Sequence, residues 1–92
     1  MTTKTIHAII SGRVQGVFFR ASTQEKAQEL RLTGWVRNCS NGDVELVAQG
    51  MPEDIQSFTE WLHIGPPHAK VEQVQVESAE KIQEEAFRIQ NT

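Results

Sequence analysis

Residues 34–50 read GWVRNCSNGDVELVAQG, and this stretch predicts the centre of the fold. Asn41 and Gly42 stand between two runs that contain valine and other strand-forming residues. An Asn-Gly pair is the strongest short signal for a tight β-hairpin, because both central positions of such a turn require positive φ angles. We therefore predict two antiparallel strands, at about residues 34–39 and 43–49, joined by a turn.

The segments before the hairpin predict a strand followed by a helix. Apolar residues stand at every second position over about residues 5–12, which is the period of a strand with one buried face. Ser22 and Glu25 have the spacing of a capping box and stand in front of the helical pattern AQELRL. We predict a helix over about residues 22–32, which ends near Gly34 because glycine commonly follows the last turn of a helix.

The segments after the hairpin predict a second helix and two more strands. Pro52 is followed by two acidic residues and by apolar residues on one helical face, which predicts a second helix. Val74 and Val76 alternate with polar residues and predict a fourth strand, and residues 87–89 predict a short fifth strand. The charged segment at about 78–85 has no clear period, so we expect an exposed connection there.

The predicted order of elements is β-α-β-β-α-β, with a short terminal strand added. This order is the split βαβ arrangement of α+β proteins, in which two helices cover one face of an antiparallel sheet. A chain of 92 residues is long enough for one small hydrophobic core. The sequence has no linker, internal repeat or low-complexity tract, so we expect residues 1–92 to form a single domain.

Composition and charge narrow the class of function. The net charge is −3, which disfavours nucleic acid as a partner because nucleic-acid-binding proteins usually present a basic surface. No aromatic pair stands on a central predicted strand, so an RNA-binding module of similar topology is also disfavoured. Nothing at the amino terminus resembles a signal peptide, so we expect none, and no apolar run approaches the roughly 20 residues of a membrane span. We expect a cytoplasmic monomer with no membrane partner.

The stretch GRVQGVFFR, residues 12–20, lies between the first predicted strand and the first predicted helix. Gly12 and Gly16 allow such a loop to turn several backbone N–H groups toward one point, where they bind an anion. The spacing differs from that of a nucleotide P-loop, which has four residues between its glycines and a lysine after them. Spacing alone leaves an alternative open, in which the glycines only make a tight turn and Arg20 is a solvated charge.

Together, GRVQGVFFR and GWVRNCSNGDVELVAQG resemble the two signature motifs of the acylphosphatase family. The first stretch has the family's glycine, arginine, valine, glutamine, glycine and valine, and then phenylalanine and arginine. The second has a glycine, an aromatic residue, a small apolar residue and a basic residue before its asparagine. Gly42, Val44 and Gly50 also stand at the family's offsets. The resemblance implies a ferredoxin-like sandwich over the whole chain.

The resemblance further implies an enzyme that hydrolyses acyl phosphates, which are carboxylic-phosphoric anhydrides, to a carboxylate and inorganic phosphate. Arg20 and Asn38 occupy the family's two catalytic positions. It implies that loop 13–20 and the Arg20 guanidinium hold the phosphoryl group, and that the Asn38 amide orients the attacking water. No cofactor and no metal are implied, and inorganic phosphate is expected to compete with the substrate. The substrate-binding residues expected in the loop are Val14, Gln15, Gly16, Val17, Phe18 and Phe19.

This reaction explains why the loop motif contains no acid, base or nucleophile. A carboxylate leaves without a general acid, because its parent acid has a pKa of about 4. Phosphoryl transfer through a loose transition state then requires mainly positioning and charge stabilisation. The residues alone leave two alternatives open: a non-catalytic module that binds phosphate or an acyl phosphate, and an Asn38 that only caps a turn.

The histidines and the cysteine have simpler explanations than catalysis. His7, His63, His68 and Cys39 lack a recognised metal-ligand spacing, so we expect no metal site. No histidine is placed by sequence to activate the cysteine, so we expect no nucleophilic role for it.

The positions of several charged and aromatic residues in the sequence predict their roles. Arg13 and Arg37 either add positive potential for an anionic substrate or are solvated charges. Of Phe18 and Phe19, we expect one to pack inward and one to line the loop. The residues expected as core aromatics are Trp35, Phe58 and Trp61.

Overall fold

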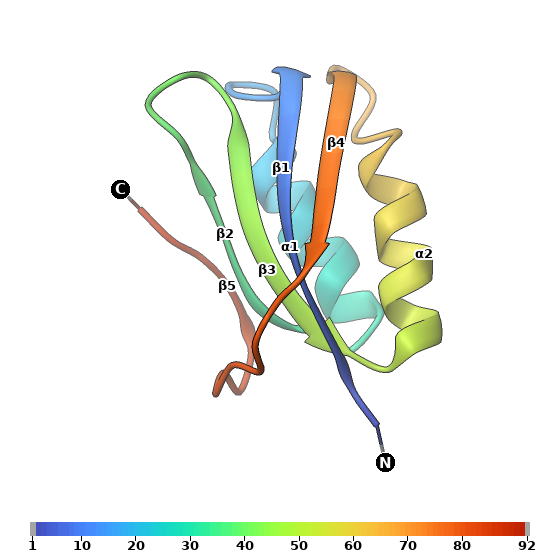
Figure 1. Cartoon of the computed structure of the whole chain (residues 1–92). Coiled ribbons are helices and arrows are strands. Elements are labelled where there is room, and N and C mark those ends of the chain that lie inside the picture. Colours follow the sequence, from blue (N-terminus) through green and yellow to red (C-terminus); the bar gives the residue numbers. More distant parts are fainter. Residues whose placement is uncertain (1, 92) are drawn as a thin grey trace.

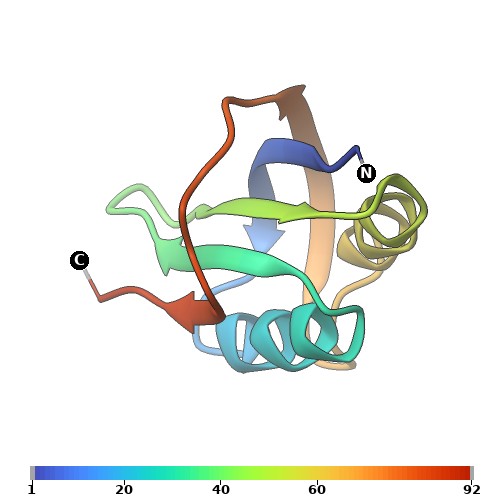
Figure 2. The same cartoon turned by 90° about the horizontal axis from the view of Figure 1, so that it is seen from below.

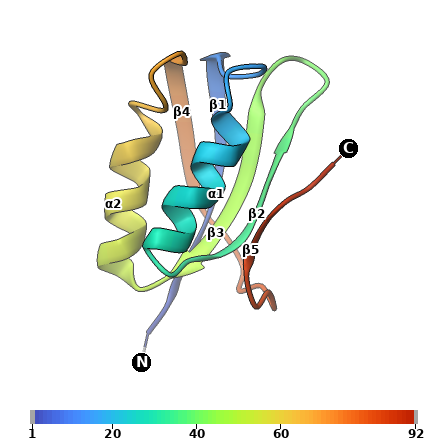
Figure 3. The same cartoon turned by 180° about the vertical axis from the view of Figure 1, so that it is seen from behind.

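The computed structural model describes residues 2–91, whose strands form one five-stranded sheet with two helices (Figure 1). In chain order, the elements are β1 (Lys4–Arg13), α1 (Phe19–Glu29), β2 (Thr33–Asn38), β3 (Val44–Gly50), α2 (Pro52–Leu62), β4 (Lys70–Ser78) and β5 (Phe87–Ile89). The strand order across the sheet is β4-β1-β3-β2-β5. Seen from behind, both helices cover the same face of the sheet (Figure 3). The predicted α+β, ferredoxin-like sandwich is confirmed.

The sheet is mixed, whereas we predicted an antiparallel one. Strands β1 to β4 pair antiparallel, but β5 pairs parallel to β2, with Gly34 opposite Phe87 and Val36 opposite Ile89. The connection over residues 79–86 crosses from the β4 edge of the sheet to the β2 edge at one end of the strands (Figure 2). β5 therefore runs opposite to β4, and this is the direction of β2.

Helix α1 begins earlier than the sequence predicts. Phe18 is its N-cap residue, with a left-handed backbone at φ 64°, and no side-chain hydrogen bond caps this end of the helix among residues 2–91. Ser22 lies inside the helix, where its amide donates a hydrogen bond to the Phe18 carbonyl at 2.9 Å. The capping-box prediction was wrong because Phe19, which is 1% exposed, fixes the first turn by packing in the core. The helix ends at Glu29, since Arg31 is left-handed at φ 59°.

The core lies between the helices and the sheet. Alternate residues of β1, β2 and β3 face the helices, as the period of a half-buried strand requires. Phe58 of α2 meets Phe87 of β5 edge to face, with ring centroids 6.0 Å apart, which ties the last strand to a helix. The buried core residues are Ile6, Ala8, Ile10, Val14, Phe19, Ala27, Leu32, Val36, Val44, Leu46, Ala48, Ile55, Phe58, Leu62 and Phe87.

Two of the three expected core aromatics belong to the core. Phe58 is fully buried and Trp61 packs against the core while partly exposed. The prediction for Trp35 was wrong: the next residue, Val36, faces the core, so Trp35 lies on the open face of the sheet. There the Arg37 guanidinium lies over the indole ring, 5.9 Å from its centroid.

The topology brings the two sequence motifs to the same end of the sheet. β1 and β3 are antiparallel neighbours, so the end of β1 lies beside the start of β3, with Ile10 opposite Val44. Asn38, at the end of β2, is also opposite Val44. The loop of residues 14–18 and the β2–β3 hairpin consequently lie next to each other at one end of the molecule (Figure 1).

Candidate active site

The loop between β1 and α1 presents backbone amides without protein partners. Among residues 2–91, the amides of residues 15–18 donate no hydrogen bond. Gly16 and Phe18 both have left-handed backbone, at φ 73° and φ 64°, and such residues turn successive N–H groups toward one concave side. The first turn of α1 adds the free N–H groups of a helix N-terminus. We call residues 14–19 the anion cradle.

The two glycines of the loop motif serve different purposes. A Cβ on Gly12 would stand 2.2 Å from the Lys70 carbonyl oxygen, so this glycine is required by the close approach of β4, where the β1–β4 register shifts between Ser11 and Gly12. A Cβ on Gly16 would meet no atom within 4 Å, so glycine is favoured there by its left-handed backbone. Gly12 is thus a residue of the sheet, and Gly16 belongs to the cradle.

Arg20 lies in the first turn of α1, and its side chain is half-buried. Its guanidinium makes no ion pair and no hydrogen bond with the described part of the chain. A cation at this end of a helix is unfavourable, because the N–H groups there have partial positive charge. Within the described part of the chain, the fold therefore gathers positive charge at one point without a compensating carboxylate, which is the environment that an anionic ligand requires.

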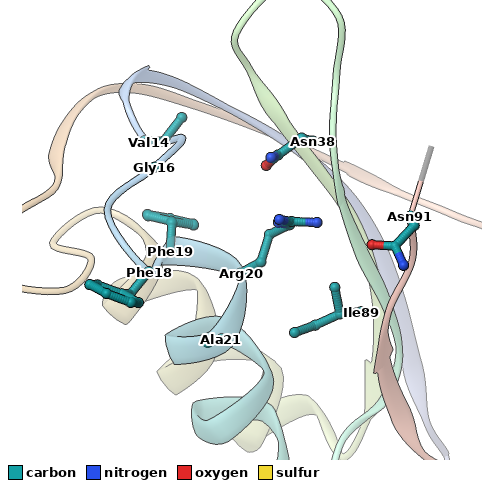
Figure 4. Close-up of a pocket in the computed structure, with 9 residues that line it drawn as sticks. All are labelled: Val14, Gly16, Phe18, Phe19, Arg20, Ala21, Asn38, Ile89 and Asn91. Carbon is teal, nitrogen blue, oxygen red and sulfur yellow. The ribbon is translucent and has the colours of Figure 1, made fainter.

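Asn38 shares a cavity of about 340 Å³ with Arg20 and the anion cradle. Its carboxamide and the Arg20 guanidinium point into the same space, one from β2 and the other from α1 (Figure 4). Two residues predicted to act together, from motifs far apart in the sequence, thus lie in one site. The residues that line the cavity are Val14, Gly16, Phe18, Phe19, Arg20, Ala21, Asn38, Ile89 and Asn91.

The loop residues predicted to bind substrate differ in where their side chains point. Gln15 does not line the cavity, because its side chain bonds to the β2–β3 hairpin, and Val17 packs against the core instead. Phe19 is buried and Phe18 is 78% exposed, so one packs inward and the other lies at the cavity surface, as expected. The predicted loop residues that line the cavity are Val14, Gly16, Phe18 and Phe19.

The carboxyl-terminal segment forms one wall of the cavity, which the sequence did not predict. Ile89 is opposite Val36 in the parallel β2–β5 pair, and continuing this register by two residues places Asn91 beside Asn38. The Asn91 side chain points toward the Arg20 guanidinium (Figure 4). The position of these residues at the cavity follows from the direction and register of β5. The sequence pattern of a strand of three residues predicts neither its direction nor its register. The lining residues that were missed are Ala21, Ile89 and Asn91.

Arg37 follows Val36 in β2 but does not face the cavity. Its Nε donates a hydrogen bond to Glu45 Oε1 at 2.6 Å, and His7 Nε2 lies 2.6 Å from Glu45 Oε2. This cluster lies on the open face of the sheet, where the Glu45 carboxylate compensates the arginine charge. The positive charge at the cavity therefore comes from Arg20 and the amides. Arg13 is exposed at the end of β1, as a solvated charge would be.

Glu45 makes the stability of the fold depend on pH. Its hydrogen bond with His7, together with the bond and charge of Arg37, lowers the pKa of Glu45 below its ordinary value of 4.5. A carboxyl whose pKa is lower in the folded than in the unfolded protein stabilises the fold at any pH above its unfolded-state pKa. This stabilisation is lost as the pH falls through the pKa of the folded state. We expect the wild type to unfold at a higher temperature than Glu45→Gln at neutral pH, and the two to converge below pH 4.5.

Thermal unfolding followed by circular dichroism across this pH range measures the effect. Glu80→Gln is the matched control, because Glu80 is exposed and makes no ion pair in the described residues. A difference between wild type and Glu45→Gln that stayed constant with pH would contradict the assignment.

Cys39 is half-buried beside Asn38. Burial raises the pKa of its thiol, and the nearby Glu45 carboxylate raises it further. A raised pKa leaves less of the thiolate that acts as a nucleophile, so the environment does not favour covalent catalysis. Within residues 2–91, no group of three or more His, Cys, Asp or Glu side chains is arranged to hold a metal ion. The same residues include no helix with the length and apolar character needed to cross a membrane.

Fold and cavity together define a class: a small ferredoxin-like α+β sandwich with a cavity, lined by a loop and an arginine, at one end of its sheet. Comparison with known proteins identifies the family within this class, since residues 6–89 match the model of the acylphosphatase family. The chain belongs to the acylphosphatase family. It is an enzyme that hydrolyses acyl phosphates to a carboxylate and inorganic phosphate.

Individual relatives agree with this family assignment. The chain is 62% identical over 69 residues to an acylphosphatase of Coxiella burnetii, an overlap of 75% of this chain and 73% of the relative. It is 49% identical over 84 residues to an acylphosphatase of Marinobacter nauticus, an overlap of 91% of each. A solved acylphosphatase structure from Coxiella burnetii has a TM-score of 0.93 at 51% identity and covers 96% of this chain and 93% of its own. The resemblance in the two motifs is therefore confirmed.

Proposed function

We propose that Arg20 and the anion cradle bind the phosphoryl group of an acyl phosphate, and that Asn38 orients the water that attacks it. The supporting observation is the convergence, at one cavity, of the Asn38 carboxamide with an arginine and backbone amides that have no partner among residues 2–91. These groups supply charge stabilisation and positioning, which are what phosphoryl transfer mainly requires.

In this proposal, the phosphoryl oxygens accept hydrogen bonds from the cradle amides and from the fork of the Arg20 guanidinium. The Asn38 carboxamide has both a donor and an acceptor, so its oxygen can accept a bond from the water and aim a water lone pair at phosphorus. The water oxygen bonds to phosphorus as the bond from phosphorus to the acyl oxygen breaks. The carboxylate leaves with the bonding electron pair, and the proton of the water passes to solvent or to the phosphate product.

We also propose the substrates, the oligomeric state and the cellular location of this enzyme. The substrates are small acyl phosphates, which a cavity of about 340 Å³ accommodates, and inorganic phosphate competes for the same amides and arginine. No cofactor takes part. Residues 1–92 act as a single domain, monomeric and cytoplasmic, for which the sequence pattern is the support.

Hydrolysis of benzoyl phosphate by the purified protein tests the proposal. We expect turnover that EDTA does not reduce, because the groups assigned to the reaction include no metal ligand. We expect competitive inhibition by inorganic phosphate. The rate should change little with pH near neutrality, because the proposal assigns no general acid or general base to the reaction. Loss of activity in EDTA, or a steep bell-shaped pH profile, would count against these assignments.

A further inference from the structure

We propose that Gln15 is a positioning residue that fixes the distance between the anion cradle and Asn38, an inference that rests on the function proposed above. Gln15 Nε2 donates hydrogen bonds to the Cys39 carbonyl and to the Asp43 carbonyl, both at 2.8 Å. A primary amide nitrogen has two N–H groups, and both are used here. A single side chain therefore joins the loop to the β2–β3 hairpin.

Both ends of this contact are direct neighbours of the residues that act on the substrate. Gln15 precedes Gly16, which lines the cavity, and Cys39 follows Asn38. The peptide units between these neighbours are planar and stiff. A shift of the loop relative to the hairpin would therefore change the separation between the cradle amides and the Asn38 carboxamide.

The hairpin that receives Gln15 is itself well fixed. The Cys39 amide donates to the Asp43 carbonyl at 2.8 Å, and the Gly42 amide donates to the Cys39 carbonyl at 3.2 Å. The Asp43 amide donates to Asn41 Oδ1 at 3.0 Å. Gln15 thus binds two carbonyls of a turn that is already closed by its own hydrogen bonds, so the hairpin serves as a rigid reference for the loop.

No other hydrogen bond performs this function in the described chain. The β1–β3 register ends at the pair of Ile10 and Val44, before the loop and the hairpin begin. Beyond it, the Gln15 bonds are the only hydrogen bonds between residues 14–18 and 39–43 among the residues described. A misplacement of about 1 Å between reacting groups costs about 10² in rate, so this one contact bears directly on catalysis.

Gln15→Met tests the inference, because methionine is unbranched and similar in length but has no N–H donor. We expect kcat for benzoyl phosphate to fall by about 10- to 100-fold, as misalignment of water and phosphorus predicts. The inhibition constant for inorganic phosphate should stay nearly unchanged, because the cradle amides and Arg20 remain. Retention of the full kcat would overturn the inference.

A double variant separates positioning from a merely structural role. If Gln15 acts through Asn38, then Gln15→Met should cause no further loss of kcat in an Asn38→Ala background. Losses that multiply in the double variant would overturn the inference. A wild-type kcat in Asn38→Ala alone would overturn the role proposed for Asn38 itself, so the two failures are distinguishable.

Gln49→Met is the matched control. Gln49 also joins distant segments through its carboxamide: Nε2 donates to the Ile82 carbonyl at 3.1 Å, and Oε1 accepts from the Ile82 amide at 2.9 Å. It is paired with Thr5 at the start of β1, at the end of the sheet away from the cavity. We expect Gln49→Met to lower Tm and leave kcat unchanged. An equal loss of kcat in both variants would overturn the inference.

Discussion

Arg20→Ala is expected to lower kcat/KM for benzoyl phosphate by about 10³ to 10⁵, the range known for arginines that face a transferring phosphoryl group. The guanidinium lines the cavity and has no protein partner within residues 2–91, so its charge is available to the phosphoryl oxygens. Arg20→Lys keeps the charge but loses the planar fork, and we expect it to restore only part of the lost rate. Steady-state kinetics on the purified variants measures both.

The same substitution should not weaken the fold. Removing a cation from the positive end of a helix relieves an unfavourable interaction, so we expect the Tm of Arg20→Ala to equal or exceed that of the wild type. Arg31→Asn is the matched control: Arg31 is exposed at the other end of the same helix, and asparagine tolerates its left-handed backbone. A loss of activity in Arg31→Asn comparable to that in Arg20→Ala would show a general charge effect rather than a specific contact.

Asn38→Ala is expected to lower kcat by about 10², since a water that is no longer oriented reaches the phosphorus in the wrong geometry. The KM and the inhibition constant for phosphate should change much less, because the anion cradle and Arg20 stay in place. Asn38→Asp tests the same position with nearly the same shape. We expect it to weaken phosphate binding as well, because a carboxylate repels the phosphoryl group across the cavity.

The separate effects of Asn38→Ala on kcat and on KM distinguish the possible roles of Asn38. A raised KM with an unchanged kcat in Asn38→Ala would mean that the residue holds substrate rather than water. Ser40→Ala provides the comparison, because Ser40 is an exposed residue of the same hairpin and does not line the cavity that Asn38 shares with Arg20. We expect its kinetics to match the wild type.

The parts of the fold that the sequence predicted are those with local causes. The hairpin lies where the Asn41–Gly42 pair predicts, but its geometry differs from the predicted one. Gly42 has a positive φ of 98°, whereas Asn41 does not, and the Gly42 amide closes the turn on the Cys39 carbonyl. Alternation of apolar residues likewise placed β1. Arg20 and Asn38 came from the motif resemblance, and their meeting in one cavity follows from the β1–β3 and β2–β3 pairings.

The parts that the sequence missed have non-local causes. Trp35 faces away from the core because Val36 faces toward it, and composition alone does not decide which of two apolar neighbours is buried. The start of α1 depends on the packing of Phe19 against other elements rather than on a local cap. The position of Asn91 depends on the connection that crosses from β4, at one edge of the sheet, to β5, at the other edge.

The placement of β5 also has a consequence for biosynthesis. One wall of the cavity consists of Ile89 and Asn91, which leave the ribosome after both helices and the other strands. A nascent chain is therefore able to bury much of its core before its cavity is complete. The proposed active site is therefore complete only after these last residues have been synthesised, and a chain cleaved by a protease just before Phe87 would lack one wall of the cavity that Arg20 lines.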